Sequence, residues 1–161
     1  MSKELLAGLR EYASTDLGSK IIRNIIENNG TVNFIEVFLP SDGFGAVDLS
    51  SSDIEITYTS NLQGWKNSRK DFHQGNQVNT ATIGSLLAHE FGHTNAGRNV
   101  LNFPAIKSIN YVNGKMEINP NASKWEEVRT VKYFENAYRE QKGMPLRTHY
   151  VNTDIMKFKE L

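Results

Sequence analysis

The chain of 161 residues contains no cysteine, which excludes disulfide bonds, thiolate metal sites, cysteine nucleophiles and thiol redox switches. Any metal ion must therefore be held by histidine, aspartate or glutamate side chains. The chain also lacks an apolar run near the roughly 20 residues that cross a bilayer, so we expect no membrane partner. Its length and its 39% hydrophobic content predict one globular domain spanning residues 1–161.

Neither sign of charge is in excess, since 18 Lys and Arg residues balance 18 Asp and Glu residues. Proteins that bind nucleic acid neutralise phosphates with a basic surface, so this balance argues against a nucleic-acid partner. The first residues, MSKELLAGLREYAS, lack the apolar stretch of a secretory signal. If the protein is exported, we expect a route that does not depend on a signal peptide.

The apolar periodicity of the first half predicts both helices and strands. A stripe of isoleucines predicts a helix over residues 16–29, which Asn29-Gly30 would stop. The β-branched and aromatic segments 31–39, 46–50 and 53–59 predict two or three antiparallel strands. Residues 60–79 are polar and without a clear period, so we expect a long surface loop there.

The second half continues the mixed pattern. A helix is predicted from Thr80 onward, with Gly97 as its possible end, and Asn113-Gly114 predicts a hairpin over residues 107–119. A last long helix is predicted over residues 123–142. The tail after it is expected to be extended.

Local signals mark both ends of that last helix. Asn121 or Ser123 can cap its start, and Glu126 stands three residues after Ser123 as in a capping box. Gly143 is the expected stop. Together these elements predict an α+β fold.

The helix after Thr80 carries the motif His89-Glu90-Phe91-Gly92-His93, an H-E-x-x-H. Positions i and i+4 share one helix face, so both imidazoles can reach one zinc ion while Glu90 handles the proton of a water. The alternative is a surface helix with two unrelated histidines. The apolar residues before the motif favour a buried helix with its metal face at a cleft.

A catalytic zinc ion usually takes three protein ligands, so a third is needed. The spacing H-E-x-x-H-x-x-G-x-x-H would require a histidine at position 99, where this chain has Asn99. His73 and His149 stand at no spacing typical of a third ligand. A glutamate of the Glu126-Glu127 pair on the following helix is the better candidate, the alternative being that both only cap that helix.

Three motifs follow in order: H-E-x-x-H, then E-E-x-R-T beginning at Glu126, then R-x-x-Y from Arg147 to Tyr150. This set resembles the clostridial neurotoxin light chains, which are zinc endopeptidases of the gluzincin group. The closer overall resemblance is to the short NleD-like bacterial effector metallopeptidases, a family also found as toxin domains of Rhs-type polymorphic toxins. It covers most of the chain, and its most distinctive part is the phrase FENAYREQKGMPLRTHY.

The resemblance implies a single zincin-like domain, with a small, mainly antiparallel sheet packed on the H-E-x-x-H helix and on a following glutamate-bearing helix. It implies Zn²⁺ as the cofactor. The zinc ligands it implies are His89, His93 and Glu127, with Glu126 supporting them from outside. Other metals that accept His and Glu ligands, such as cobalt, manganese or nickel, remain open.

The resemblance also implies the catalytic groups. Glu90 is the expected general base, which takes a proton from a zinc-activated water and passes it to the leaving amine. Arg147 and Tyr150 are the expected donors to the charge that grows on the substrate carbonyl oxygen. An edge strand commonly holds extended substrate in such peptidases, and the strand at residues 53–59 is the candidate here.

Several other residues have plainer interpretations. Glu135 and Arg139 are four residues apart on one helix, so we expect a surface ion pair, with a role around the metal as the alternative. Trp65 and Trp125 are expected to be core or loop anchors.

The sequence thus predicts a zinc endopeptidase of the effector or toxin type, acting on a protein or peptide in the cytoplasm of a target cell. A cognate immunity protein is a possible further partner. One alternative is a zinc amidase that acts on peptidoglycan peptides or another small amide. The other is a binding module without catalysis, against which the intact Glu90 argues.

Overall fold

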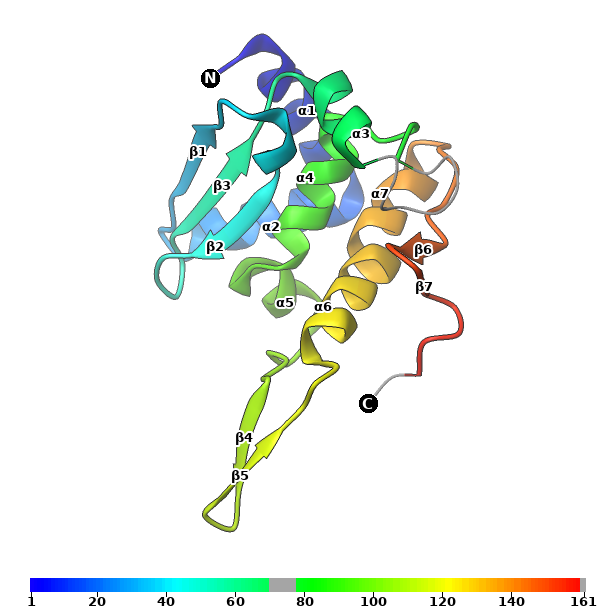
Figure 1. The fold of residues 1–161 in the computed structure, drawn as a ribbon. Coiled ribbons are helices and arrows are strands. Elements are labelled where there is room, and N and C mark those ends of the chain that lie inside the picture. Colours follow the sequence, from blue (N-terminus) through cyan, green and yellow to red (C-terminus); the bar gives the residue numbers. More distant parts are fainter. Residues whose placement is uncertain (70–77, 160–161) are drawn as a thin grey trace.

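The computed structural model describes residues 1–69 and 78–159, and it confirms the expected α+β composition. A small sheet and a group of helices enclose α4, and one hairpin extends away from the body (Figure 1). The helical elements are α1 Lys3–Ala13, α2 Asp16–Glu27, η1 Pro40–Asp42, α3 Leu62–Arg69, α4 Ile83–Gly92, α5 Asn95–Leu101, α6 Ala122–Thr130, the π-helical η2 Val131–Glu135 and α7 Asn136–Gln141. The strands are β1 Val32–Glu36, β2 Gly45–Asp48, β3 Ile54–Tyr58, β4 Ile109–Val112, β5 Lys115–Ile118, β6 His149–Tyr150 and β7 Thr153–Asp154. No helix of the described residues is both long and apolar enough to cross a membrane.

The main sheet has the strand order β1-β3-β2, and it differs from the antiparallel prediction. β2 pairs antiparallel with β3, but β1 pairs with β3 in parallel. A short turn returns the chain from β2 to β3, which leaves β3 in the centre and β1 on its far side. The expectation that residues 53–59 form an edge strand is therefore wrong, because β3 has a neighbour on both sides.

The helix α4 lies at the centre of the molecule, and every one of its ten residues is buried. Its predicted apolar side packs into the main core with Ile54, Ile56 and Tyr58 of the sheet, which alternate along β3 toward the helices. A helix that is apolar nearly all round is typical of a buried position. The sheet and α1 thus pack against the helix that carries the H-E-x-x-H motif.

The predicted end of this helix at Gly97 is wrong. The helix α4 ends at Gly92, with His93 as its C-cap residue, and a separate helix, α5, begins at Asn95. The hydroxyl of Thr94 accepts a hydrogen bond from the Gly97 backbone N–H at 3.2 Å and donates one to the Phe91 carbonyl at 2.6 Å. Gly97 packs against that carbonyl so closely that a Cβ atom would lie 2.3 Å from it. The glycine therefore permits a sharp bend just after the motif.

The predicted last helix is present as a continuous run from α6 through η2 to α7, and Gly143 follows it with a φ of +66°, as the stop signal requires. The predicted capping box at Ser123 is wrong, because the helix already begins at Ala122 behind Asn121, whose side chain makes no capping bond. The helix packs closely on α4. A Cβ atom on Gly92 would lie 2.7 Å from the Phe134 ring and 2.9 Å from the Thr130 methyl group, so Gly92 sets the distance between the two helices.

The predicted surface loop at residues 60–79 is partly helical, since α3 occupies Leu62–Arg69, while residues 70–77 lie outside the described residues. The side chain of Asn61 accepts a hydrogen bond from the Gly64 backbone N–H and so caps the start of α3. Trp65 is buried and meets Phe44 edge to face, with ring centroids 5.8 Å apart. The burial of Trp65 against other parts of the chain thus stabilises α3, a helix that its polar sequence does not predict.

Three further elements complete the fold. The predicted hairpin is confirmed as β4 and β5, with Asn113 and Gly114 both at positive φ. The expected extended tail is in part a short β6–β7 hairpin, and Trp125 stacks on Phe158 of that tail. The helix α1, which packs on α4, was not among the predicted elements.

Candidate metal centre

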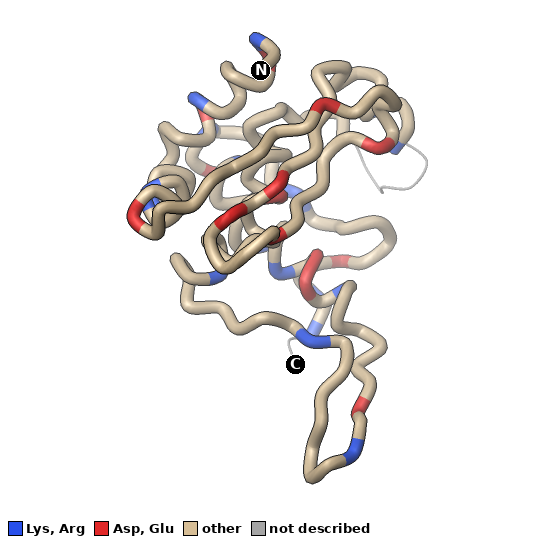
Figure 2. The backbone as a smooth tube through the Cα atoms, turned by 90° about the vertical axis from the view of Figure 1, so that its left-hand side faces the viewer, with Lys and Arg blue, Asp and Glu red and all other residues tan. Residues whose placement is uncertain are grey.

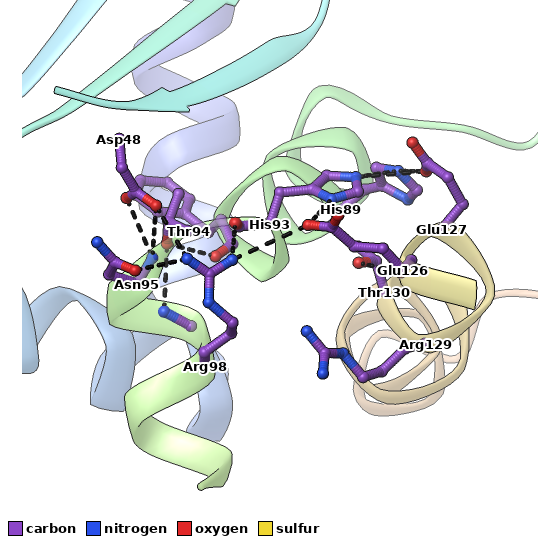
Figure 3. Close-up of polar contacts among 12 residues, drawn as sticks. Asp48, His89, His93, Thr94, Asn95, Arg98, Glu126, Glu127, Arg129 and Thr130 are labelled. Carbon is purple, nitrogen blue, oxygen red and sulfur yellow. Dashed lines mark hydrogen bonds and ion pairs between the residues drawn. The ribbon is translucent and has the colours of Figure 1, made fainter. Parts of the chain in front are cut away.

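His89 and His93 lie on the same side of the end of α4, as their spacing predicts (Figure 3). His93 is the C-cap residue, but its φ of −76° and ψ of −14° are still right-handed helical, so the i, i+4 relationship is retained. The two Nε2 atoms are 3.1 Å apart. Both rings therefore present the same nitrogen to one point.

Glu127 of α6 completes a triangle with these two nitrogens. Its Oε2 atom lies 3.0 Å from Nε2 of His89 and 3.3 Å from Nε2 of His93. In a tetrahedral zinc site with bonds of about 2.0–2.1 Å, neighbouring ligand atoms are separated by about 3.3 Å. The three atoms therefore already have the spacing that one zinc ion requires, and within the described part of the chain these residues form the group that could hold a metal.

The outer nitrogens of both rings face carboxylates. Nδ1 of His89 is 3.1 Å from Oε2 of Glu135, and Nδ1 of His93 is 3.3 Å from Oε1 of Glu126. An ionised carboxylate only accepts hydrogen bonds, so Glu135 and Glu126 favour a proton on Nδ1 of each ring, which is the tautomer that leaves Nε2 able to bind a metal ion. The Glu127 carboxylate lies 3.0 and 3.3 Å from the two Nε2 atoms, where either ring protons or one metal ion shared by the three atoms would satisfy it. This donor set fits a metal ion.

The expectation of a surface ion pair between Glu135 and Arg139 is wrong. Both residues are fully buried, with exposed fractions of 0% and 1%. Oε1 of Glu135 accepts from Nε of Arg139 at 2.9 Å, and Oε2 accepts from Nη1 of Arg147 at 2.9 Å. Burial by itself would raise the pKa of Glu135, but the charge of Arg147, the hydrogen bond with His89 and the charge of Arg139 hold it below its usual range. Glu135 is therefore an anion that orients a candidate metal ligand.

The π-helical segment η2 explains how Glu135 reaches the same side as Glu127. In a regular α-helix, residues eight apart differ by about 80° around the axis. A π-helical turn takes up one additional residue, which brings such a pair close to the i, i+7 relationship and onto one face. The sequence signal for Glu135 was its i+8 spacing from Glu127, which is informative only once η2 is known.

An open cleft of about 540 Å³ lies beside the three ligand atoms. It is lined by residues 44–48, His89, Glu90, His93, Arg98, Ser123, Glu126, Glu127 and Tyr150. Glu90 is buried, and this burial raises the pKa of its carboxyl group. The cleft thus combines the candidate metal ligands with a carboxyl group whose proton affinity is enhanced.

Tyr150 and Arg147 take different positions. The Tyr150 ring stacks on the His89 ring at 6.0 Å between centroids, and the residue lines the cleft. Burial and the charge of Glu127 raise the pKa of Tyr150 to about 12, so its phenol keeps its proton at neutral pH. The Arg147 guanidinium donates to Glu135 and to the His149 carbonyl, and it lies 5.2 Å from the Tyr150 ring centroid.

His149 is separate from this group. His149 pairs with Asp154 between β6 and β7, and its Nδ1 is 2.9 Å from the Thr148 hydroxyl. His73 lies outside the described residues. The structure thus brings together His89, His93, Glu126, Glu127, Glu90 and Tyr150, and it adds Glu135.

A scan against protein-family models, a search of curated proteins and a search of solved structures found no match to this chain.

Proposed function

We propose that this chain is a zinc-dependent endopeptidase with a zincin-like fold. The observation that carries the proposal is the triangle of His89, His93 and Glu127 ligand atoms at 3.0–3.3 Å, which opens onto a cleft lined by Glu90 and Tyr150. A zinc ion held there would supply Lewis-acid chemistry, polarising a substrate carbonyl and lowering the pKa of a water. The Glu90 carboxyl group and the Tyr150 phenol beside the three candidate ligands support catalysis rather than metal binding alone.

Glu90 is the proton carrier in this proposal. The pKa of its carboxyl group is raised toward neutral pH, where one group can both accept and release a proton. It accepts the proton of the attacking water and passes it to the leaving amine. Such general-base assistance contributes about 10²–10⁴-fold in rate.

Tyr150 and Arg147 have separate roles. Tyr150 keeps its phenolic proton and faces the cleft, so it donates to the oxygen on which negative charge grows. Arg147 is directed to Glu135, and we assign it to holding the Glu135–His89 pair and the Tyr150 ring in place. This assignment changes the expected role of Arg147 from a donor to the substrate into a positioning residue.

The strand β2 is the better candidate for holding substrate, in place of β3. The Leu49 backbone N–H donates to the Asp53 carbonyl at 2.8 Å, so residues 49, 47 and 45 direct their backbone groups toward β3. By the same alternation, the backbone groups of Ala46 and Asp48 point away from β3. β2 is an edge strand, since β3 is its one neighbour among the described strands. Residues 44–48, which include β2, line the cleft. An extended polypeptide can pair with this edge and pass the metal ligands.

The biological setting of the proposal rests on the resemblance alone. We propose that the endopeptidase is a bacterial effector or toxin, delivered without a signal peptide, that cleaves a protein in the cytoplasm of a target cell. A cognate immunity protein is the expected partner in the producing cell.

The proposal is tested with purified protein and two variants, Glu90→Gln and Glu127→Gln, beside the exposed hairpin variant Glu117→Gln as a matched control. Elemental analysis is expected to find about one zinc per chain in the wild type, Glu90→Gln and Glu117→Gln, but not in Glu127→Gln. Mass spectrometry of unfolded casein is expected to find new termini with the wild type and the control, at rates about 10²–10⁴-fold lower with Glu90→Gln.

Four results would contradict the proposal. A wild type without metal would remove the metal centre. Cleavage that survives Glu90→Gln would remove the general base. Hydrolysis of peptidoglycan peptides without cleavage of any protein would favour the amidase, and zinc binding without either activity would favour a binding module.

A further inference from the structure

A second polar network lies at the other end of the candidate centre, around Arg98 of α5 (Figure 3). The Arg98 side chain is largely buried, with 14% of its surface exposed. Nη2 lies 3.0 Å from Oδ2 of Asp48 on β2 and also donates to the Asn95 side chain. Nη1 donates to the His93 carbonyl and lies 3.9 Å from Oε1 of Glu126. One side chain thus contacts β2 and the end of α4, and it lies near α6.

Asp48 is tied into this network twice. Besides the ion pair with Arg98, its carboxylate accepts the Asn95 backbone N–H at 3.0 and 3.1 Å. Asn95 is the first residue of α5, directly after the Thr94 cap. The last residue of β2 is therefore bound to the start of α5 by a charged group that also accepts from Arg98.

The contacts of Arg98 distinguish between two roles, which are binding of a substrate anion and positioning of neighbouring groups. An arginine that bound a substrate anion would direct a terminal nitrogen into the cleft. Here both terminal nitrogens face groups of the chain itself, which are Asp48, Asn95, the His93 carbonyl and Glu126. Arg98 therefore acts through its neighbours rather than on substrate.

We propose that Arg98 and Asp48 form a positioning pair that holds the β2 edge at a set distance from the metal ligand His93. The proposal rests on the proposed function, since β2 there carries the substrate and His93 the metal. His93 lies at the end of α4, where carbonyl groups have no donor within the helix. Arg98 donates a hydrogen bond to the His93 carbonyl. Glu126, which faces Nδ1 of His93, lies near the same guanidinium. Without the pair, the carbonyl group of a substrate held by β2 would no longer be correctly placed relative to a metal ion held by His93.

The test compares Arg98→Gln and Asp48→Asn, alone and combined, with Arg129→Gln as a matched control. Arg129 is a comparably buried arginine that donates to the Pro104 carbonyl and stacks on Phe103, outside the cleft lining. The Asp48→Asn variant would keep an oxygen for the Asn95 N–H but lose the charge that Arg98 faces. The readouts are zinc affinity by competition with a chelator, and kcat and KM on a peptide that the wild type cleaves.

For Arg98→Gln we expect zinc affinity to fall by about 10-fold, as is usual for groups that orient a metal ligand. We expect kcat to fall by about 10- to 100-fold with KM changed less than about threefold, because a misplaced reacting group costs rate more than binding. Asp48→Asn is expected to lower kcat in the same way, and the double variant to be no worse than Arg98→Gln, since the two residues act as one unit. The control is expected to retain wild-type kcat and zinc affinity, even if it unfolds at a lower temperature.

An active wild type whose Arg98→Gln variant retains both kcat and zinc affinity would overturn the positioning role alone. Equal losses in Arg129→Gln would also overturn it, because they indicate general destabilisation. Additive losses in the double variant would overturn it too, because they indicate that the two residues act independently. A wild type that binds no zinc would instead overturn the proposed function, and the positioning role with it.

Discussion

The Glu135 carboxylate lies 3.1 Å from Nδ1 of His89 and is itself enclosed by the guanidinium groups of Arg139 and Arg147. One buried anion therefore joins a candidate metal ligand to two separate parts of the chain, η2 with α7 and the segment that leads into β6. The H-E-x-x-H helix carries this candidate ligand, and the buried anion behind it orients the ring.

Replacement of Glu135 by Gln is expected to weaken both folding and metal binding. The amide keeps the shape but removes the anion that two buried guanidinium groups share, and breaking a buried ion pair in this way costs about 3–5 kcal/mol of unfolding free energy. The loss of a carboxylate behind His89 is expected to lower zinc affinity by about 10- to 100-fold. Urea unfolding and chelator competition measure the two effects. Wild-type values for both would show that Glu135 is dispensable, and exposed Glu117→Gln serves as the control.

Replacement of Gly92 by Ala is expected to destabilise the protein, although alanine favours a helix by about 1 kcal/mol. The new methyl group would lie 2.7 Å from the Phe134 ring, and forcing apart a packed core costs about 1–3 kcal/mol. Because α4 and α6 carry the candidate metal ligands, their separation is also expected to lower zinc affinity. Thermal unfolding with and without zinc checks this prediction, and a stabilised variant with unchanged zinc affinity would contradict it.

The stability of the sheet is expected to depend on pH through Asp53. Its carboxylate accepts from the hydroxyl and the backbone N–H of Thr31 and from the Ser50 hydroxyl, and these bonds lower the pKa of Asp53 from its ordinary value. A lowered pKa in the folded state adds stability above the unfolded-state pKa of about 3.9, and that stability is lost as the pH falls through the folded value. Asp53→Asn is therefore expected to lower the unfolding temperature at pH 7, with a gap to wild type that narrows below about pH 4. A gap independent of pH would contradict this assignment.

The β4–β5 hairpin extends away from the body, between α5 and α6 (Figures 1 and 2). Cross-strand pairing puts four apolar side chains on one face, and they are 46–75% exposed: Ile109, Tyr111, Met116 and Ile118. Because these side chains are not buried, Tyr111→Ser with Met116→Ser is expected to change the unfolding free energy by less than about 0.5 kcal/mol per site. Zinc content and cleavage of a short peptide are expected to stay the same. A large loss of stability would show that this face is covered in solution.

The sequence by itself determined the local features of this protein. The i, i+4 spacing of His89 and His93 put both rings on one face, since helix geometry alone sets it. Asn113-Gly114 determined the hairpin because few other dipeptides adopt its turn. The isoleucine stripe of α2 indicated its buried side, where Ile21 and Ile25 lie, although Ile26 of the same stripe is 67% exposed. Each of these depends on residues within a few positions of one another.

The tertiary structure decided what depends on contacts between distant segments. Whether Glu126 or Glu127 faces the two Nε2 atoms was decided by the packing of α6 on α4 across Gly92. The burial of Glu135 depended on η2 and on Arg147 from another segment, and the central place of β3 depended on β1 pairing across the sheet. The helix α3 depended on the burial of Trp65. These outcomes arise because burial and ion pairing are properties of the assembled core, and a sequence window of ten or twenty residues does not contain the partners.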